Sequence, residues 1–166
     1  MRPCRRSQAD WLLALRLYLG MSIAAHLVWE ILQLSFYTLW TTGTTQQKAF
    51  AVLHCAAGDA MIAGLSLLAA LALFGRPKWP HANAFRVYWT TLVLGGGYTI
   101  FSEWLTTVVR GSWSYSELMP VLPLTGTGLA PLLQWLVVPP LALWFATGRG
   151  PLNDRNESET NLHQKP

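Results

Sequence analysis

Four long apolar runs constrain this chain more than any other feature of its sequence. They cover roughly residues 12–37, 50–74, 87–109 and 129–147, and each is close to the ~20 residues that a helix needs to cross a bilayer. Hydrophobic residues make up 52% of the 166 residues and charged residues only 12%, a balance that soluble domains rarely have. The sequence therefore predicts an all-α integral membrane protein folded as a four-helix bundle.

We expect a single transmembrane domain over residues 1–150 and a disordered cytoplasmic tail over residues 151–166, which is polar and lacks apolar periodicity.

The distribution of charge predicts the topology of this domain. With four spans, ten of the twelve Lys and Arg residues fall on the side of the two termini, whereas Lys48 and Arg110 fall on the other. Because cytoplasmic loops collect basic residues, both termini are expected in the cytoplasm. The basic start imitates a signal peptide, but the apolar run continues to Tyr37, which indicates an uncleaved first span.

The strongest polar side chains of the spans are expected in the outer half of the bilayer, because a helix rises about 1.5 Å per residue and successive spans alternate in direction. These residues are His26, Glu30, Gln33, His54, Asp59, Glu103 and Gln134. Ionisable groups are costly inside a membrane, so we expect them to face the bundle interior and to pair. His26 and Glu30, at positions i and i+4, can share a proton directly. Glu103 shares a helical face with Thr99 and Arg110, and pairs with either Arg110 or another helix.

The segment after the third run, GSWSYSELMPVLPLTGTGLAPLLQW, is too apolar to be a freely solvated linker. We expect it to fold over the outer side of the bundle as a lid or re-entrant segment, because irregular backbone at membrane depth needs protein or a wet cavity beside it. A purely structural cap is the alternative. Trp113 and Tyr115 of this loop, together with Tyr37 and Trp104, are predicted to line a cavity or to shield positive charge.

These considerations define two sets of candidate site residues. The candidate catalytic residues are His26, Glu30, Asp59 and Glu103. The candidate substrate-binding residues are Gln33, Tyr37, His54, Trp104, Trp113, Tyr115 and Gln134. We expect no cofactor and no bound metal, since the sequence has no HxxxH, HxxHH or HExxH motif. Nucleic acid is not an expected partner, because no basic patch with interleaved aromatic residues occurs.

Four stretches, HLVWEILQLSFYTLW, HCAAGDAMIAG, YTIFSEW and WSYSELMPVLPLTGTGLAPLLQW, resemble a group of small bacterial four-span membrane proteins. The resemblance covers most of residues 20–145 and implies an architecture and a bacterial inner (plasma) membrane location, but no activity. A much weaker similarity is to the EXPERA family, whose sterol isomerases hold a lipophilic substrate in a polar-lined intramembrane cavity. That similarity implies proton transfer by a His and acidic residues and cation shielding by a Trp, at the matching positions His26, Glu30, Glu103 and Trp104.

Three classes of function fit these residues. A membrane-embedded acid/base enzyme acting on an isoprenoid or other lipid would have a polar cavity in the outer half, open sideways to the bilayer. A transporter of protons, metal or a small solute would need a polar path through both halves, whereas the cytoplasmic half is nearly all apolar. A non-enzymatic accessory or assembly protein would use the same residues only to hydrogen-bond its helices. The bilayer is a partner in each case, with a lipophilic small molecule in the first and a homo-oligomer or partner membrane subunit in the third.

Overall fold

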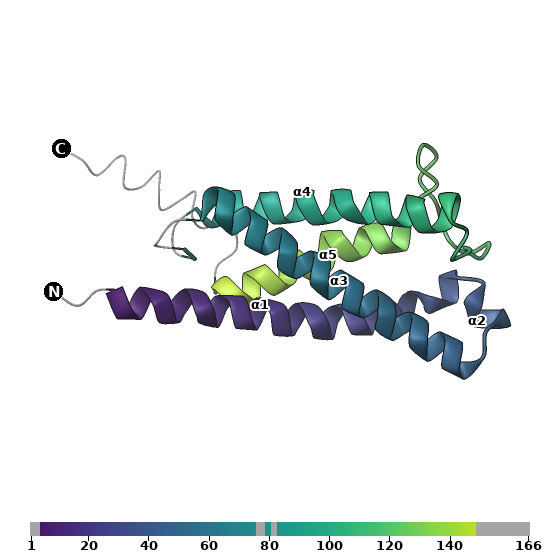
Figure 1. Cartoon of the computed structure of the whole chain (residues 1–166), viewed down its shortest axis with the longest axis horizontal. Helices are drawn as coiled ribbons and strands as arrows, with labels where there is room; N and C mark the ends of the chain where they lie inside the picture. Colours follow the sequence, from purple (N-terminus) through teal and green to yellow (C-terminus); the bar gives the residue numbers. More distant parts are fainter. Residues whose placement is uncertain (1–3, 76–78, 81–82, 149–166) are drawn as a thin grey trace.

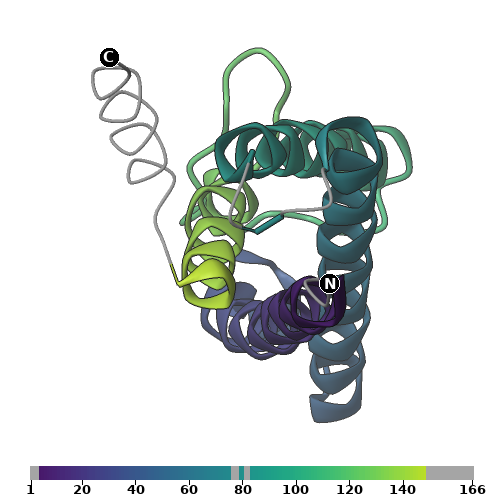
Figure 2. The ribbon, with the colours of Figure 1, turned by 90° about the vertical axis from the view of Figure 1, so that its left-hand side faces the viewer.

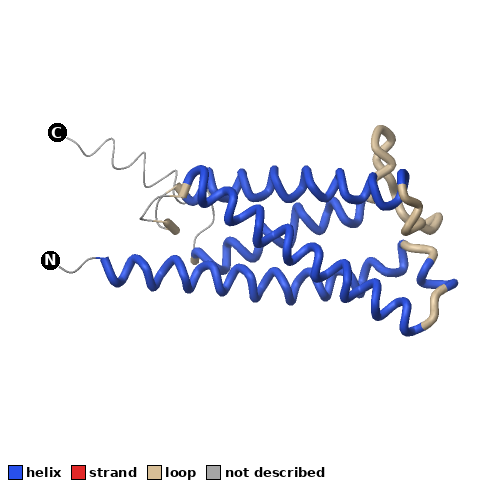
Figure 3. Tube along the Cα trace, viewed as in Figure 1, coloured by secondary structure: helices blue, strands red, loops and turns tan. Residues whose placement is uncertain are grey.

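The computed structural model describes residues 4–75, 79–80 and 83–148, and this part of the chain is helical without a β-strand (Figure 3). It has four long helices, namely α1 (Cys4–Gln33), α3 (Thr45–Phe74), α4 (Ala84–Glu103) and α5 (Leu129–Thr147). Three short elements complete it, namely η1 (Leu34–Phe36), α2 (Leu39–Thr42) and the π-helical turns η2 (Trp104–Val109), which continue α4. The all-α prediction is confirmed for these residues, and the expected tail over 151–166 lies outside them.

Helix boundaries follow local sequence signals. α3 begins before the predicted apolar run because Thr44 and Gln47 form a reciprocal capping box at its start. α5 runs without a break through Pro139 and Pro140, although prolines within a helix remove backbone hydrogen bonds.

Three helical segments of the described chain are long and apolar enough to cross a membrane: Trp11–Phe36, Thr45–Phe74 and Leu129–Thr147. They coincide with three of the four predicted runs and support a membrane location. α4 is the fourth long helix, and it is more polar because it contains Arg86, Glu103 and three consecutive glycines.

Each of the four long helices packs beside two of the others. α1 contacts α3 and α5, and α4 contacts the same two helices. In the end-on view of Figure 2, α1 and α4 therefore lie at opposite corners. We call the end of the molecule with α2 the loop end, and the end at which α1 begins the terminal end (Figure 1).

The two ends of the helix assembly have different interiors. Toward the terminal end, buried side chains from all four long helices form a mostly apolar core that includes Tyr18, Leu67, Val87, Trp135 and Leu143. Toward the loop end, α3 diverges from α4, as both ribbon views show (Figures 1 and 2). The polar residues lie in this more open half.

The loop over residues 111–128 is held to other parts of the chain by backbone hydrogen bonds. The Thr38 backbone N–H donates to the Ser114 carbonyl at 3.0 Å, and the Ser116 N–H donates to the Phe36 carbonyl at 2.8 Å. Tyr37 and Tyr115 sit opposite each other between these bonds. The loop thus docks on the segment that joins α1 to α3 and closes the loop end.

Candidate functional site

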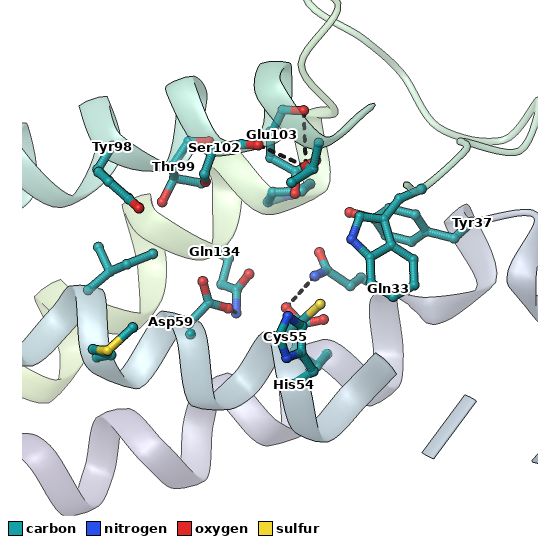
Figure 4. Close-up of a pocket in the computed structure, with 17 residues that line it drawn as sticks. Gln33, Tyr37, His54, Cys55, Asp59, Tyr98, Thr99, Ser102, Glu103 and Gln134 are labelled. Atoms are coloured by element: carbon teal, nitrogen blue, oxygen red, sulfur yellow. Dashed lines mark hydrogen bonds between the residues drawn. The ribbon is translucent and has the colours of Figure 1, made fainter. Parts of the chain in front are cut away.

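Eight of the eleven candidate residues line one cavity of about 250 Å³ near the loop end. They are Glu30, Gln33, Tyr37, His54, Asp59, Glu103, Trp113 and Gln134. In Figure 4, Glu103 on α4 faces Asp59 on α3 across the cavity, and Gln134 of α5 lies between them. Four helices and the loop therefore contribute polar groups to one site.

The α1 side of the cavity is a ladder of side chains on one helical face. The Gln33 amide donates to Glu30 Oε1 at 2.6 Å, and the Trp29 indole N–H donates to Gln33 Oε1 at 3.2 Å. Residues three or four apart on a helix are neighbours on its surface, so these contacts follow from the sequence spacing. They fix the Glu30 carboxyl toward the cavity.

Gln134 of α5 lines the cavity and connects three helices. Its amide nitrogen donates to Asp59 Oδ2 at 2.9 Å and to His26 Nδ1 at 2.8 Å. Because an amide nitrogen can only donate, Nδ1 is the acceptor and the His26 proton is on Nε2. Gln134 and His26 are 1% and 0% exposed, so the bridge is buried.

Glu30 and Asp59 form a carboxyl pair at the cavity wall. Both side chains line the cavity, Glu30 from α1 and Asp59 from α3. Two carboxylates cannot bond unless one holds a proton, so the pair is suited to sharing one proton between two oxygen atoms. A carboxyl pair of this kind can both give and take a proton.

Glu103 has a different set of partners. The Tyr115 hydroxyl, from the loop, donates to Glu103 Oε2 at 2.5 Å and accepts from the Gly128 N–H at 2.8 Å. Burial, with the nearby Glu103 charge, raises the pKa of Tyr115 above its usual range, so this hydroxyl remains a donor at neutral pH. Tyr37 lines the same cavity as Glu103. The loop is thereby tied to a cavity carboxyl.

His26 and Glu30 do not pair with each other, although their spacing on α1 allows it. His26 contacts Gln134, and its Nδ1 lies 3.7 Å from Asp59 Oδ2, whereas Glu30 bonds Gln33. The reason is that α5 inserts a side chain between α1 and α3, where sequence spacing within α1 alone allows a direct bond. Glu103 pairs with Tyr115 rather than with Arg110, because the loop folds back over the end of α4.

Three candidates do not line the cavity. Trp104 is 41% exposed and lies beside Phe101, because adjacent residues point about 100° apart around a helix and its neighbour Glu103 faces inward. Trp104 is therefore not part of the wall of this cavity. His26 and Tyr115 stand behind the lining residues and contact them. His54 is exposed at the cavity edge, where its ring stacks on Phe50 at 5.5 Å.

The structure adds Cys55 and Ser102, which sequence reasoning missed, to the cavity lining. It also adds Thr99, which the sequence placed only on the helical face of Glu103. Ser22 and Tyr18, one and two turns before His26, are fully buried and continue the polar face of α1 toward the terminal end. The signal for them was the i, i+4 spacing from Glu30 backwards.

No group of three or more His, Cys, Asp or Glu side chains in the described part of the chain is arranged to hold a metal ion. Comparison with known proteins finds no match to a protein-family model, a curated protein or a solved structure.

Proposed function

We propose that this chain is a four-span protein of the bacterial inner membrane with both termini in the cytoplasm. Three apolar helices support a membrane location. The inclusion of α4 is supported by large apolar side chains on its outside, among them Val93, which is 68% exposed, and Phe101. Sorting of basic residues toward one side supports the orientation.

Within this topology, the proposed activity is acid/base catalysis on a lipophilic substrate, an isoprenoid or another lipid. The observation that carries the proposal is the cavity itself, into which Glu30, Asp59 and Glu103 project from three different helices. A carboxyl pair that shares a proton can protonate a substrate at one atom and remove a proton at another, as an isomerisation requires. Glu103, Tyr37 and Trp113 lie where positive charge developing on the substrate would be stabilised.

Sideways access supports a membrane-dissolved substrate. The cavity lining includes Met61 of α3 and Tyr98 of α4, whose side chains are 63% and 54% exposed. These residues lie on the two helices that diverge, so the opening between them faces the bilayer in the proposed topology. Trp113 covers the cavity from the loop. The expected partners are therefore the bilayer and a lipophilic small molecule.

The transport alternative has less support. Between the site and the terminal end, the polar face of α1 ends at Tyr18, whose hydroxyl donates to the Ala63 carbonyl at 3.4 Å. Apolar side chains around it, including Leu67 and Trp135, pack tightly across the interior. A closed core of this kind suits a site that binds and reacts better than a path for a solute.

The proposal is tested by replacing the gene, in the organism that carries it, with Glu30→Gln, Asp59→Asn and Glu103→Gln variants. The matched control is Glu117→Gln, because Glu117 is an exposed acid of the loop outside the cavity lining. Lipid extracts are compared by untargeted mass spectrometry, and folded yield is measured in mild detergent.

At equal folded yield, the three cavity variants are expected to accumulate a lipophilic precursor that cells with wild-type protein or Glu117→Gln do not. Identical lipid profiles in all strains would refute catalysis. Loss of folded protein in the cavity variants without any lipid change would favour an accessory protein whose polar residues hold its helices together.

A further inference from the structure

The hydroxyl group of Thr99 is a buried polar group of the cavity with no hydrogen-bond partner among the described residues. Thr99 is 4% exposed, and its Oγ1 atom is one of the few buried side-chain atoms left unsatisfied. The residue lines the cavity and projects from α4 on the side that faces Asp59 and Gln134 (Figure 4). Buried polar groups in native proteins are nearly always hydrogen-bonded, so this exception requires an explanation.

Other threonines of α4 and η2 show what Thr99 does not do. The hydroxyls of Thr91, Thr106 and Thr107 donate to the carbonyl four residues earlier, at 2.8, 2.8 and 2.6 Å. This local bond is the usual solution for a threonine within a helix. Thr99 leaves this bond unmade, so its buried hydroxyl is an unpaired donor in a residue that lines the cavity.

The charge of the cavity restricts the ligand. Its lining has carboxyl, amide and hydroxyl groups, and no Lys or Arg among the described residues; His54 at the exposed edge is its one basic side chain. A phosphate or carboxylate head would meet Glu30, Asp59 and Glu103 without a compensating cation. An uncharged oxygen avoids that repulsion and can accept a hydrogen bond from Thr99.

We infer that Thr99 binds the uncharged oxygen, hydroxyl or carbonyl, at the polar end of a membrane amphiphile, and that the cavity rejects phosphate and carboxylate heads. The inference rests on the proposed function and names the class of its substrate. The Thr99 hydroxyl donates to the ligand oxygen, and the carboxyl groups of Glu30 and Asp59 accept a hydrogen bond from a hydroxyl head or, when protonated, donate one to a carbonyl. The apolar remainder of the ligand leaves between α3 and α4, past Met61 and Tyr98.

The test uses photo-crosslinking of the full chain in lipid nanodiscs with a hexadecanol that carries a diazirine near its hydroxyl. Labelled peptides are identified by mass spectrometry. Unlabelled hexadecanol, hexadecanal, hexadecanoate and hexadecyl phosphate, which share one chain length and differ in head group, compete for the site. No turnover is required, so the result does not depend on catalysis.

The informative variant is Thr99→Val, which keeps the shape of the side chain and removes its hydroxyl. Labelling of the cavity peptides is expected to fall about tenfold, the effect of one lost hydrogen bond. Thr99→Ser retains a hydroxyl and should restore labelling to within about twofold of wild type. The matched control is Thr91→Val, because Thr91 is equally buried in the same helix but its hydroxyl is bonded and outside the cavity.

The head-group series tests the ligand class. Hexadecanol and hexadecanal should compete, whereas hexadecanoate and hexadecyl phosphate should not. Equal competition by the phosphate, unchanged labelling of Thr99→Val, or no labelling of cavity peptides in wild type would each overturn the inference. Labelling as expected without any lipid change in the cavity variants would mean that the site binds such a ligand and does not convert it, so the proposed function alone would fail.

Discussion

The three consecutive glycines of α4 give a sharp test of how α4 packs on α5. A Cβ atom added at Gly95 would lie 2.0, 2.6 and 2.7 Å from three ring atoms of Trp135. The ring cannot move aside at low cost, because Trp135 is 1% exposed and belongs to the core. At Gly96 and Gly97, an added Cβ would meet nothing within 4 Å. Close approach therefore requires glycine at one of the three positions only.

The expected magnitudes follow from this geometry. Overpacking of a filled core costs roughly 1 to 3 kcal/mol. Replacing glycine by alanine within a helix gains up to about 1 kcal/mol of helix propensity. The difference in unfolding free energy between Gly95→Ala and Gly96→Ala removes the shared propensity gain and isolates the clash, so Gly95→Ala should be less stable by about 1 to 3 kcal/mol. Gly97→Ala should match Gly96→Ala.

The assay is reversible unfolding of each purified variant in mixed micelles, with increasing fractions of sodium dodecyl sulfate and helicity as the signal. If Gly95→Ala and Gly96→Ala unfold at the same point, α4 does not pack against Trp135 as described. The cavity between α4 and the other helices would then lose its structural basis too.

Two further substitutions test the polar contacts. Gln134→Met removes two interhelical hydrogen bonds at about 0.6 to 1.7 kcal/mol each, so the free energy of unfolding should fall by roughly 1 to 3 kcal/mol. The control Leu136→Met, on the exposed face of α5, should change it little. Equal stability of the two variants would contradict the Gln134 bridge. Tyr115→Phe releases the loop from Glu103 and should speed hydrogen exchange of loop amides about tenfold, as loss of about 1.4 kcal/mol predicts. In the control Tyr98→Phe, at a half-exposed tyrosine, the loop amides should exchange at the wild-type rate. A wild-type exchange rate in Tyr115→Phe as well would show that other contacts hold the loop.

Sequence reasoning located the helices well because their signals are local. Apolar runs predict the central parts of the helices, but α1 and α3 begin earlier, at Cys4 and Thr45 rather than near residues 12 and 50. The polar first turn of α3 is stabilised by the capping box at Thr44. The gathering of Glu30, Asp59 and Glu103 was also predictable, because ionisable groups in apolar helices are driven to the interior.

Partners across helices could not be predicted from the sequence. His26 and Glu30 lie one turn apart on α1, so their spacing favours a direct bond. The orientation of α5 about its own axis instead places the Gln134 side chain between His26 of α1 and Asp59 of α3. Likewise, Tyr115 reaches Glu103 only because an irregular loop folds back over α4. Helix rotation and loop path depend on packing of the whole chain, which no periodicity within one segment contains.

The buried face of α1 carries polar groups further along the helix than the sequence predicts. Tyr18, Ser22, His26 and Glu30 recur every fourth residue and are all at least nine-tenths buried, a stripe about 18 Å long at 1.5 Å per residue. Composition hides its part toward the terminal end, because serine is small and tyrosine counts as hydrophobic. Only the part of the stripe toward the loop end, around Glu30, opens onto the cavity. Toward the terminal end, Tyr18 is enclosed by the core and its hydroxyl donates to the Ala63 carbonyl. The same stripe thus has two roles. Its residues toward the terminal end pack against neighbouring helices, and its residues toward the loop end form the wall of a site.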